Sequence, residues 1–363
     1  MTATPLAPAD TTARTPVKGA RLRALRGPGG LSLRVEGRAL VTGAVLAAVG
    51  LALAVVLIGT GDFEIAPADV VRTLLGNGSP ADDFIVNDLR LPRVLVAVLV
   101  GAALGMAGAV FQSVSRNPLG SPDLLGFGYG SAVGALVVIV LFKGGATEVA
   151  AGAVAGGVLA GAAVYLLAYR QGVHGYRLVL VGIGSSAVLV AVIQYLIAKA
   201  QLVEATRAMV WLTGSLAGRD WSQVWPLLAT CALLFPLVLG QNRALRMIEM
   251  GDDSAYALGV PVERTRMLLM LAAVLLTTAA AAAAGPISFV ALAAPQLARR
   301  LTRSPGPNLL TGALMGAVLL LASDLASQRA FGADQLPVGV VTGLVGGVYL
   351  LWLLVTERRA GRI

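Results

Sequence analysis

Two arginines in the stretch RLPR have the residue type and the spacing needed to bind carboxylates. Arg90 and Arg93 are three residues apart, so on a helical turn both guanidinium groups lie on one face. A guanidinium group can bind a carboxylate through two parallel hydrogen bonds, and two such groups can orient an acidic partner. The alternative is a pair of interfacial arginines whose charged ends reach from a membrane span to water.

Covalent and metal chemistry have few candidate residues. The chain has one Cys and one His, which excludes a disulfide within the chain and makes a His/Cys zinc cluster or a Cys–His catalytic pair implausible. A phosphate-binding loop of the pattern G-x-x-x-x-G-K-[ST] is absent, so we expect no ATP hydrolysis by this chain. No apolar segment carries a ladder of carboxylates or several arginines, which argues against a proton relay or a voltage sensor. We predict neither catalytic nor metal-binding residues.

A stiff loop separates two apolar runs. The stretch SRNPLGSPDLLG, residues 115–126, follows VLVAVLVGAALGMAGAVF and leads into LLGFGYGSAVGALVVIVLF. Pro118 and Pro122 fix their own φ angles and restrict the residues before them, so the turn holds nearby side chains in place. Irregular backbone at membrane depth is tolerated where it lines a cavity or is buried in protein. The loop is therefore either a simple turn or part of a pathway.

Composition places these candidates in a membrane. Of the 363 residues, 57% are hydrophobic and 13% are charged, and the mean hydropathy is +0.80. Soluble domains have about 45–50% apolar and about 25% charged residues, and an α-helix needs about 20 apolar residues to cross a bilayer. We predict an all-α polytopic membrane protein with ten transmembrane helices. The predicted spans are 39–59, 92–112, 124–142, 147–169, 178–199, 222–240, 266–285, 287–301, 309–328 and 337–356.

The distribution of basic residues predicts the orientation. Ten spans put both termini on one side, and a cytoplasmic location for them places most of the 28 Lys and Arg residues there, in accord with the positive-inside rule. The net charge of +9 then reflects membrane topology, and we expect no nucleic-acid partner. We divide the chain into a disordered basic cytoplasmic tail at 1–38, a transmembrane domain at 39–356 and a short cytoplasmic tail at 357–363.

Pairs of small residues four positions apart predict close helix packing. Glycine at this spacing lets helix backbones approach closely in lipid. The pairs are Gly101/Gly105, Gly130/Gly134, Gly152/Gly156, Gly157/Gly161 and Gly312/Gly316. Asp324 is the only acid well inside a predicted span, near its outer end, where water, a backbone amide or an arginine could satisfy it. We expect a structural role for this carboxylate.

A short helix is predicted in MGDDSAYALGVPVERTR, the longest cytoplasmic segment between spans. Residues 254–259 can form this helix, with Asp252 or Asp253 as its N-cap and Gly259 at its end. From the residues alone, an ordinary surface helix explains the segment.

One family of membrane proteins carries similar motifs in the same order. The BtuC/FecCD-like permeases have motifs that resemble FIVNDLRLPRVLVAVLVGAALGMAGAVFQSVSRNPLGSPDLLG, ALGVPVERTR, AGPISFVALAAPQLARRL and SDLASQRAFGADQLPVGVVTGLVGGVYLLWLL. The resemblance extends from about residue 40 to 356. These permeases are the membrane subunits of ATP-driven importers for ferric siderophores, haem and cobalamin. Gln296 departs from the pattern, since many members carry His after the Pro of this motif.

The resemblance implies three sets of functional residues. The residues implied for a gate at the cytoplasmic end of the pathway are Asn117, Pro118 and Leu119. The residues implied for docking carboxylates of a binding protein are Arg90, Arg93 and Arg329. The residues implied for a coupling helix, which sits in a cleft of the ATPase, are Ser254, Ala257, Leu258, Gly259 and Val260. The spacing of Arg329 from Asp324 is one residue longer than in the family pattern.

The resemblance also implies the function and the partners. The chain would be the permease subunit of an ATP-driven (ABC) importer, forming half of the pathway and receiving substrate from an extracytoplasmic binding protein. Its partners would be a second permease subunit, a paralogue rather than an identical copy, and two ATPase subunits. ATP and Mg would bind to the ATPase, and no cofactor to this chain. The expected location is the inner (cytoplasmic) membrane of a bacterium.

Two questions stay open at this point. The stretch GGVYLLWLL is similar to the siderophore branch, which favours ferric siderophores as the cargo over haem and cobalamin. A stand-alone secondary transporter or channel is the alternative from another class, and it predicts intramembrane charged sites or filter-like loops, of which the sequence has few. A membrane enzyme would need a His/Cys/Asp constellation that the chain lacks.

Overall fold

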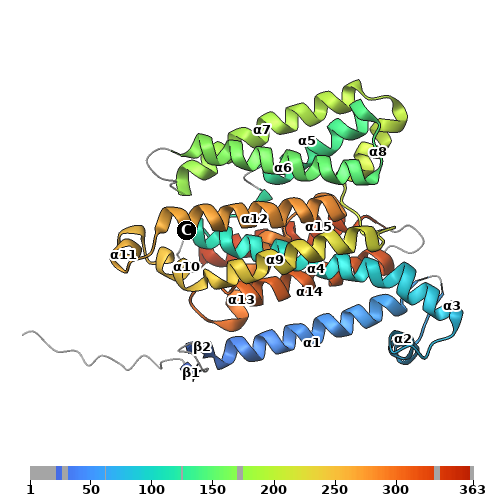
Figure 1. The fold of residues 1–363 in the computed structure, drawn as a ribbon, viewed down its shortest axis with the longest axis horizontal. Coiled ribbons are helices and arrows are strands. Elements are labelled where there is room, and N and C mark those ends of the chain that lie inside the picture. Colours follow the sequence, from blue (N-terminus) through green and yellow to red (C-terminus); the bar gives the residue numbers. More distant parts are fainter. Residues whose placement is uncertain are drawn as a thin grey trace, which may run out of the picture.

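The chain folds as a bundle of helices (Figure 1). The computed structural model describes residues 22–26, 32–61, 63–123, 126–169, 175–330 and 336–359. The helices are α1 (Gly37–Gly59), α2 (Pro67–Leu74), α3 (Pro80–Asp83), α4 (Leu91–Ser115), α5 (Phe127–Val137), α6 (Ala146–Ala168), α7 (Gly175–Lys199), α8 (Leu202–Leu212), α9 (Trp221–Gly240), α10 (Asn242–Glu249), α11 (Asp252–Ala257), α12 (Val262–Ala284), α13 (Val290–Thr302), α14 (Leu309–Arg329) and α15 (Val338–Arg359). Two π-helical segments, η1 (Phe84–Arg90) and η3 (Val138–Phe142), precede α4 and continue α5.

A helix lies in every range for which the sequence predicts a span. Among the described residues, seven helices are long and apolar enough to cross a membrane. The apolar parts of α5 with η3 and of α15 are shorter, and α13 has only 13 residues. The chain is therefore a multi-pass, predominantly helical membrane protein.

The eighth predicted span starts later than the sequence suggests. It is expected from residue 287, but α13 begins at Val290. Gly285 ends α12 with φ 76°, and Phe289 precedes α13 with φ 68°, so the chain makes two left-handed turns between the helices. Apart from α11, which matches the predicted short helix, four helices lie outside all predicted spans: α2, α3, α8 and α10. In α10, Leu245 and Ile248 are buried on one face of a short amphipathic helix.

The predicted N-terminal tail contains a short hairpin that the sequence did not suggest. Strands β1 (Leu22–Arg26) and β2 (Ser32–Glu36) pair antiparallel, and β2 leads directly into α1. A two-stranded hairpin by itself is at best marginally stable in water. The rest of this tail before residue 32 and the last four residues of the chain lie outside the described residues. At the other end, α15 continues to Arg359, past the predicted limit of the membrane domain at residue 356.

Three helices form the centre of the bundle. In α4, 83% of the most apolar stretch is buried inside the protein, and α12 and α14 have the next highest buried shares. In α1 and α7 only 17% of the corresponding stretch is buried. Gly101 and Gly105 of α4 face the backbone of Gly316 and Gly312 of α14, where an added Cβ would overlap a carbonyl oxygen. Gly134 of α5 meets α6 in the same way. These contacts confirm the close packing predicted from the glycine spacing.

The two ends of the bundle carry different short helices. Helices α10 and α11 lie at one end, together with the start of α1, and α2 and α3 lie at the other (Figure 1). We call these the α11 end and the α2 end. Helices α5, α6 and α7 form a group on one side of the centre, and α1 lies on the opposite side (Figure 1).

Candidate functional site

The α2 end contains a buried ion pair. Arg93, in the first turn of α4, donates from Nε to Oδ2 of Asp324 (3.1 Å) and from Nη2 to Oδ1 (2.7 Å). Asp324 of α14 is fully buried, whereas 21% of the Arg93 side chain is exposed. Gln328 Nε2 also donates to this carboxylate, at 2.9 Å. Arginine is thus the partner of Asp324, one of the three kinds of partner expected for it, and the structural role remains a prediction that this contact supports.

Arg90 joins the end of α1 to the start of α4. Its Nη1 donates to the carbonyl oxygen of Ile58 (2.7 Å), and its Nη2 donates to that of Phe63 (2.6 Å). The guanidinium group therefore satisfies backbone acceptors near the end of a helix, where carbonyl groups lack helical partners.

A recess of about 330 Å³ opens beside these arginines. Arg90, Arg93 and Thr60 line it. Arg329 lies at its edge, with Nη2 3.4 Å from the Thr60 hydroxyl and 3.7 Å from a carboxylate oxygen of Glu64. The Arg329 side chain is 57% exposed, far more than that of Arg93. The structure thus gathers all three arginines predicted for docking around one recess, although each already has a partner within the chain.

The proposed gate loop is a hydrogen-bonded turn at the α11 end. Helix α4 ends with Arg116 in the left-handed conformation, at φ 51°. The side-chain Oδ1 of Asn117 accepts a hydrogen bond from the Leu119 amide (2.9 Å), and its carbonyl oxygen accepts from the Gly120 amide (2.9 Å). Asn117 and Leu119 are half-buried, and Pro118 is exposed. The asparagine side chain thus braces the loop, in addition to the prolines that the sequence singles out.

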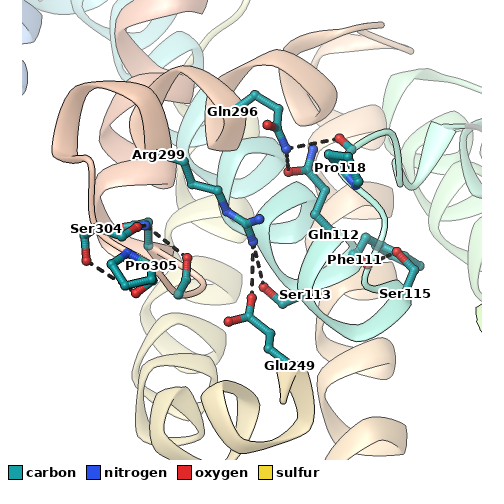
Figure 2. A network of polar contacts seen from close by, with 12 residues as sticks. Phe111, Gln112, Ser113, Ser115, Pro118, Glu249, Gln296, Arg299, Ser304 and Pro305 are labelled. Atoms are coloured by element: carbon teal, nitrogen blue, oxygen red, sulfur yellow. Dashed lines mark hydrogen bonds and ion pairs between the residues drawn. The ribbon is translucent and has the colours of Figure 1, made fainter. Parts of the chain in front are cut away.

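Two glutamines fasten this loop to α13. Gln296 Nε2 donates to Gln112 Oε1 (2.6 Å) and to the carbonyl oxygen of Pro118 (3.1 Å), as Figure 2 shows. Gln112 Nε2 in turn donates to the carbonyl oxygen of Leu292 (3.0 Å). The sequence analysis did not single out Gln112, although an amide inside the run AGAVFQSV is a signal for a buried polar contact. Gln296, identified only as a departure from the family pattern, contacts the predicted gate.

Helix α11 starts earlier than predicted. It spans Asp252–Ala257, and its N-cap is Gly251 rather than Asp252 or Asp253. The carboxylate of Asp252 does not cap the helix because it accepts two hydrogen bonds from Arg266 Nη2, both at 2.9 Å. Gly251 has φ 120°, which a residue with a side chain rarely adopts.

The end of α11 agrees with the predicted pattern. Gly259 has φ 80°, and Val260 donates from its amide to the Ala255 carbonyl (3.0 Å), which closes the last turn. Tyr256 and Leu258 are exposed on the outer surface of this helix, at 52% and 59%. Ser254, Ala257 and Gly259 are also exposed.

Ion pairs connect the α10–α11 segment to its neighbours. Arg299 of α13 lies 3.2 Å from a carboxylate oxygen of Glu249 and donates to the Ser113 hydroxyl at 3.1 Å (Figure 2). Arg116 lies 3.7 Å from Oδ1 of Asp252. These contacts join α10, α11, α13 and the end of α4 in one polar cluster.

A cavity of about 510 Å³ lies inside the bundle between α5, α7, α12 and the start of α15. Small and apolar side chains form most of its wall, and its polar groups include Asp123, Gln194 and Thr277. Among the described residues, no group of three or more His, Cys, Asp or Glu side chains could hold a metal ion.

Comparison with known proteins agrees with this architecture. The model of the FecCD transport family matches residues 39–356. The chain is 45% identical over 300 residues to the ferric enterobactin transport system permease protein FepG of Escherichia coli K12, covering 83% of this chain and 91% of FepG. It is 37% identical over 328 residues to the Fe(3+)-citrate import system permease protein YfmE of Bacillus subtilis 168, covering 90% and 98%.

A solved structure gives the same result. An inward-facing metal-chelate type ABC transporter superposes with a TM-score of 0.76 at 26% sequence identity, and the match covers 88% of this chain and 99% of that one. Together with the family match over nearly all of the membrane domain, this shows that the chain belongs to the FecCD transport family of ABC importer permeases.

Proposed function

We propose that this chain is the membrane permease of an ATP-driven importer for ferric siderophores in the inner membrane of a bacterium. The observation that carries the proposal is the 45% identity, over most of both chains, to a permease named for ferric enterobactin transport. A second permease named for ferric citrate supports iron chelates as the cargo class. The ATPase is a separate partner, which supplies ATP hydrolysis with Mg.

The proposed topology has ten spans, with the α11 end in the cytoplasm. It rests on the ten helices at the predicted positions and on the excess of basic residues on that side. The α2 end, with its recess and three arginines, then faces the binding protein.

Docking is proposed to use the recess at the α2 end. Arg329 is the most exposed of the three arginines and its contact with Glu64 is long, so it is free to exchange this carboxylate for one on the binding protein. Arg93 and Arg90 extend the positive surface into the recess while keeping their own partners. Reversing the charge of Arg329 with Arg329→Glu is expected to weaken association with the binding protein, and an acid-to-Arg change on that partner is expected to restore it. Unchanged association with Arg329→Glu would remove this part of the proposal.

The α11 end is proposed to carry the gate and the coupling surface. Asn117, Pro118 and Leu119 form the braced turn that would close the pathway, and the exposed face of α11 would enter a cleft of the ATPase. The pathway itself would run between this chain and a second permease, for which a paralogue is favoured over an identical copy. Helices α7 and α15 carry large apolar side chains that are exposed at the surface of this chain, so both are available to that partner.

An uptake experiment tests the proposal. A host that lacks its own permeases of this family receives this gene together with its ATPase, partner permease and binding protein, and uptake of iron-labelled siderophores, haem and labelled cobalamin is measured. Uptake of one ferric siderophore supports the proposal. Uptake of haem or cobalamin alone would show that the cargo is that compound and not a ferric siderophore. Absence of uptake of all three compounds refutes the proposed cargo class. Co-purification of an ATPase separates an importer from a stand-alone transporter.

A further inference from the structure

The α10–α11 segment is attached to the last turn of α4 at two points. Glu249 reaches the Ser113 hydroxyl through Arg299, with distances of 3.2 Å and 3.1 Å. Arg116, the residue that follows α4, pairs with Asp252 at 3.7 Å. Both attachments therefore lie where α4 ends and the gate loop begins.

Asp252 is a fixed point on α11. Its carboxylate accepts two hydrogen bonds from Arg266, whose side chain is only 4% exposed. Arg266 also pairs with Glu263 at 3.1 Å in the first turn of α12. The Asp252 carboxylate is therefore held between α11 and the start of α12 and is not free to rotate.

Arg116 is the residue at which the loop leaves α4. It holds the left-handed conformation at φ 51°, and Asn117 follows it directly. The other side of the loop is held by Gln296, which donates to the Pro118 carbonyl from α13. The loop thus lies between an attachment to α11 and an attachment to α13.

We propose that Arg116 and Asp252 are a positioning pair that makes the gate loop follow α11 when the ATPase closes. This inference rests on the proposed function and names residues that the family resemblance did not supply. The pair is partly exposed, at 46% and 34% of the two side chains, so water screens it in part. The hydrogen bond from Gln296 to the Pro118 carbonyl holds the other side of the loop to α13.

Distances between spin labels in the assembled importer test the pair. Cys231 is the only cysteine, so Cys231→Ser provides a background for labels at Leu119→Cys on the loop and Asp253→Cys on α11. A second label pair, Asp253→Cys with Leu202→Cys on exposed α8, reports the movement of α11 itself. Distances are measured without nucleotide and with ATP and vanadate.

The matched control is Arg303→Gln. Arg303 also ends a helix in the left-handed conformation, at φ 50°, and it is exposed without a side-chain ion pair among the described residues. In the parent we expect one narrow distribution of distances between the labels on the loop and on α11. We expect Arg116→Gln to broaden this distribution, Arg116→Lys to preserve it, and Arg303→Gln to leave it unchanged. In an Asp252→Asn background, Arg116→Gln should add no further broadening.

The two label pairs separate the possible failures. If nucleotide leaves the distance from α11 to α8 unchanged, the proposed coupling role of α11 fails, and this inference fails with it. If α11 moves and the loop follows it in Arg116→Gln as in the parent, the positioning pair alone is overturned. Equal broadening by Arg116→Gln with and without the Asp252 carboxylate also overturns it.

Discussion

Removing one partner of the Arg93–Asp324 pair should destabilise the protein strongly, and removing both should not. In Arg93→Met the carboxylate of Asp324 remains fully buried, with hydrogen bonds only from its own helix, where Gln328 Nε2 donates at 2.9 Å. Leaving such a charge uncompensated costs about 3–5 kcal/mol. In Asp324→Leu the guanidinium group of Arg93 is already one-fifth exposed and borders the recess, so it can turn to water, at a cost of about 1–3 kcal/mol.

The double variant Arg93→Met/Asp324→Leu leaves no buried charge. Replacing a buried ion pair by apolar side chains is often neutral or stabilising, so we expect a stability within about 1 kcal/mol of the parent. The losses of stability in the two single variants then sum to about 3 kcal/mol or more above the loss in the double variant. This difference is a large coupling energy for two residues. Arg72→Met provides the control, because Arg72 makes an exposed pair with Asp69 at 3.5 Å and should have almost no effect.

Thermal stability in detergent measures these differences. The fraction of monodisperse protein after heating is followed by size-exclusion chromatography for the parent, both single variants, the double variant and the control. Taking about 2 °C per kcal/mol for a large domain, Arg93→Met should lower the Tm by roughly 6 °C or more. An unchanged Tm for Arg93→Met, or a double variant that loses the sum of both single effects, would falsify the reasoning.

Three further outcomes are expected. Asn117→Ala removes the acceptor of the Leu119 amide, so it should increase ATP-independent leak of substrate through the reconstituted importer, and leak equal to the parent would count against a gating role. Gly259→Val must adopt φ 80° at a cost of about 1–2 kcal/mol, so it should reduce ATPase stimulation by the binding protein, whereas Gly259→Asn should retain most of it; equal activity of the two variants contradicts the argument. Hydrogen bonds from Ser222 hold the pKa of Asp220 below 3.8 at the start of α9, so the capping contribution is present above that pH and is lost as the pH falls through the lowered pKa. Asp220→Ala should cost about 1 kcal/mol of stability at pH 7 and less as the pH falls through the lowered pKa, and a pH-independent difference would contradict this assignment.

The membrane helices could be predicted because their signal is local. An apolar block of about 20 residues identifies a span wherever it occurs, and the described helices lie at the predicted positions. The glycine pairs carry a second local signal, and the α4–α14 contact uses two of them. The exceptions are segments whose course depends on distant contacts. The start of α13 is an example, because α13 begins only after the left-handed turn at Phe289.

The polar contacts could be predicted only in part. The sequence indicates that Asp324 needs a partner. That partner is Arg93, which lies 231 residues earlier and was predicted to dock the binding protein instead. Asp252 has the residue type of an N-cap, and nothing in its neighbourhood reveals that Arg266 would take its carboxylate. Charged side chains have several possible uses, and the choice among them depends on the three-dimensional packing.

The separation between Arg93 and Asp324 also has a consequence for synthesis on the ribosome. At about 5–20 residues per second, α14 emerges roughly 10–50 s after the start of α4. During that interval Arg93 has no carboxylate partner, and its long side chain can remain with the lipid headgroups. The glycine face of α4 also lacks its contact with α14 during this interval. The first half of the chain can therefore insert early, but its central helix reaches its final place only after the ninth predicted span has been made.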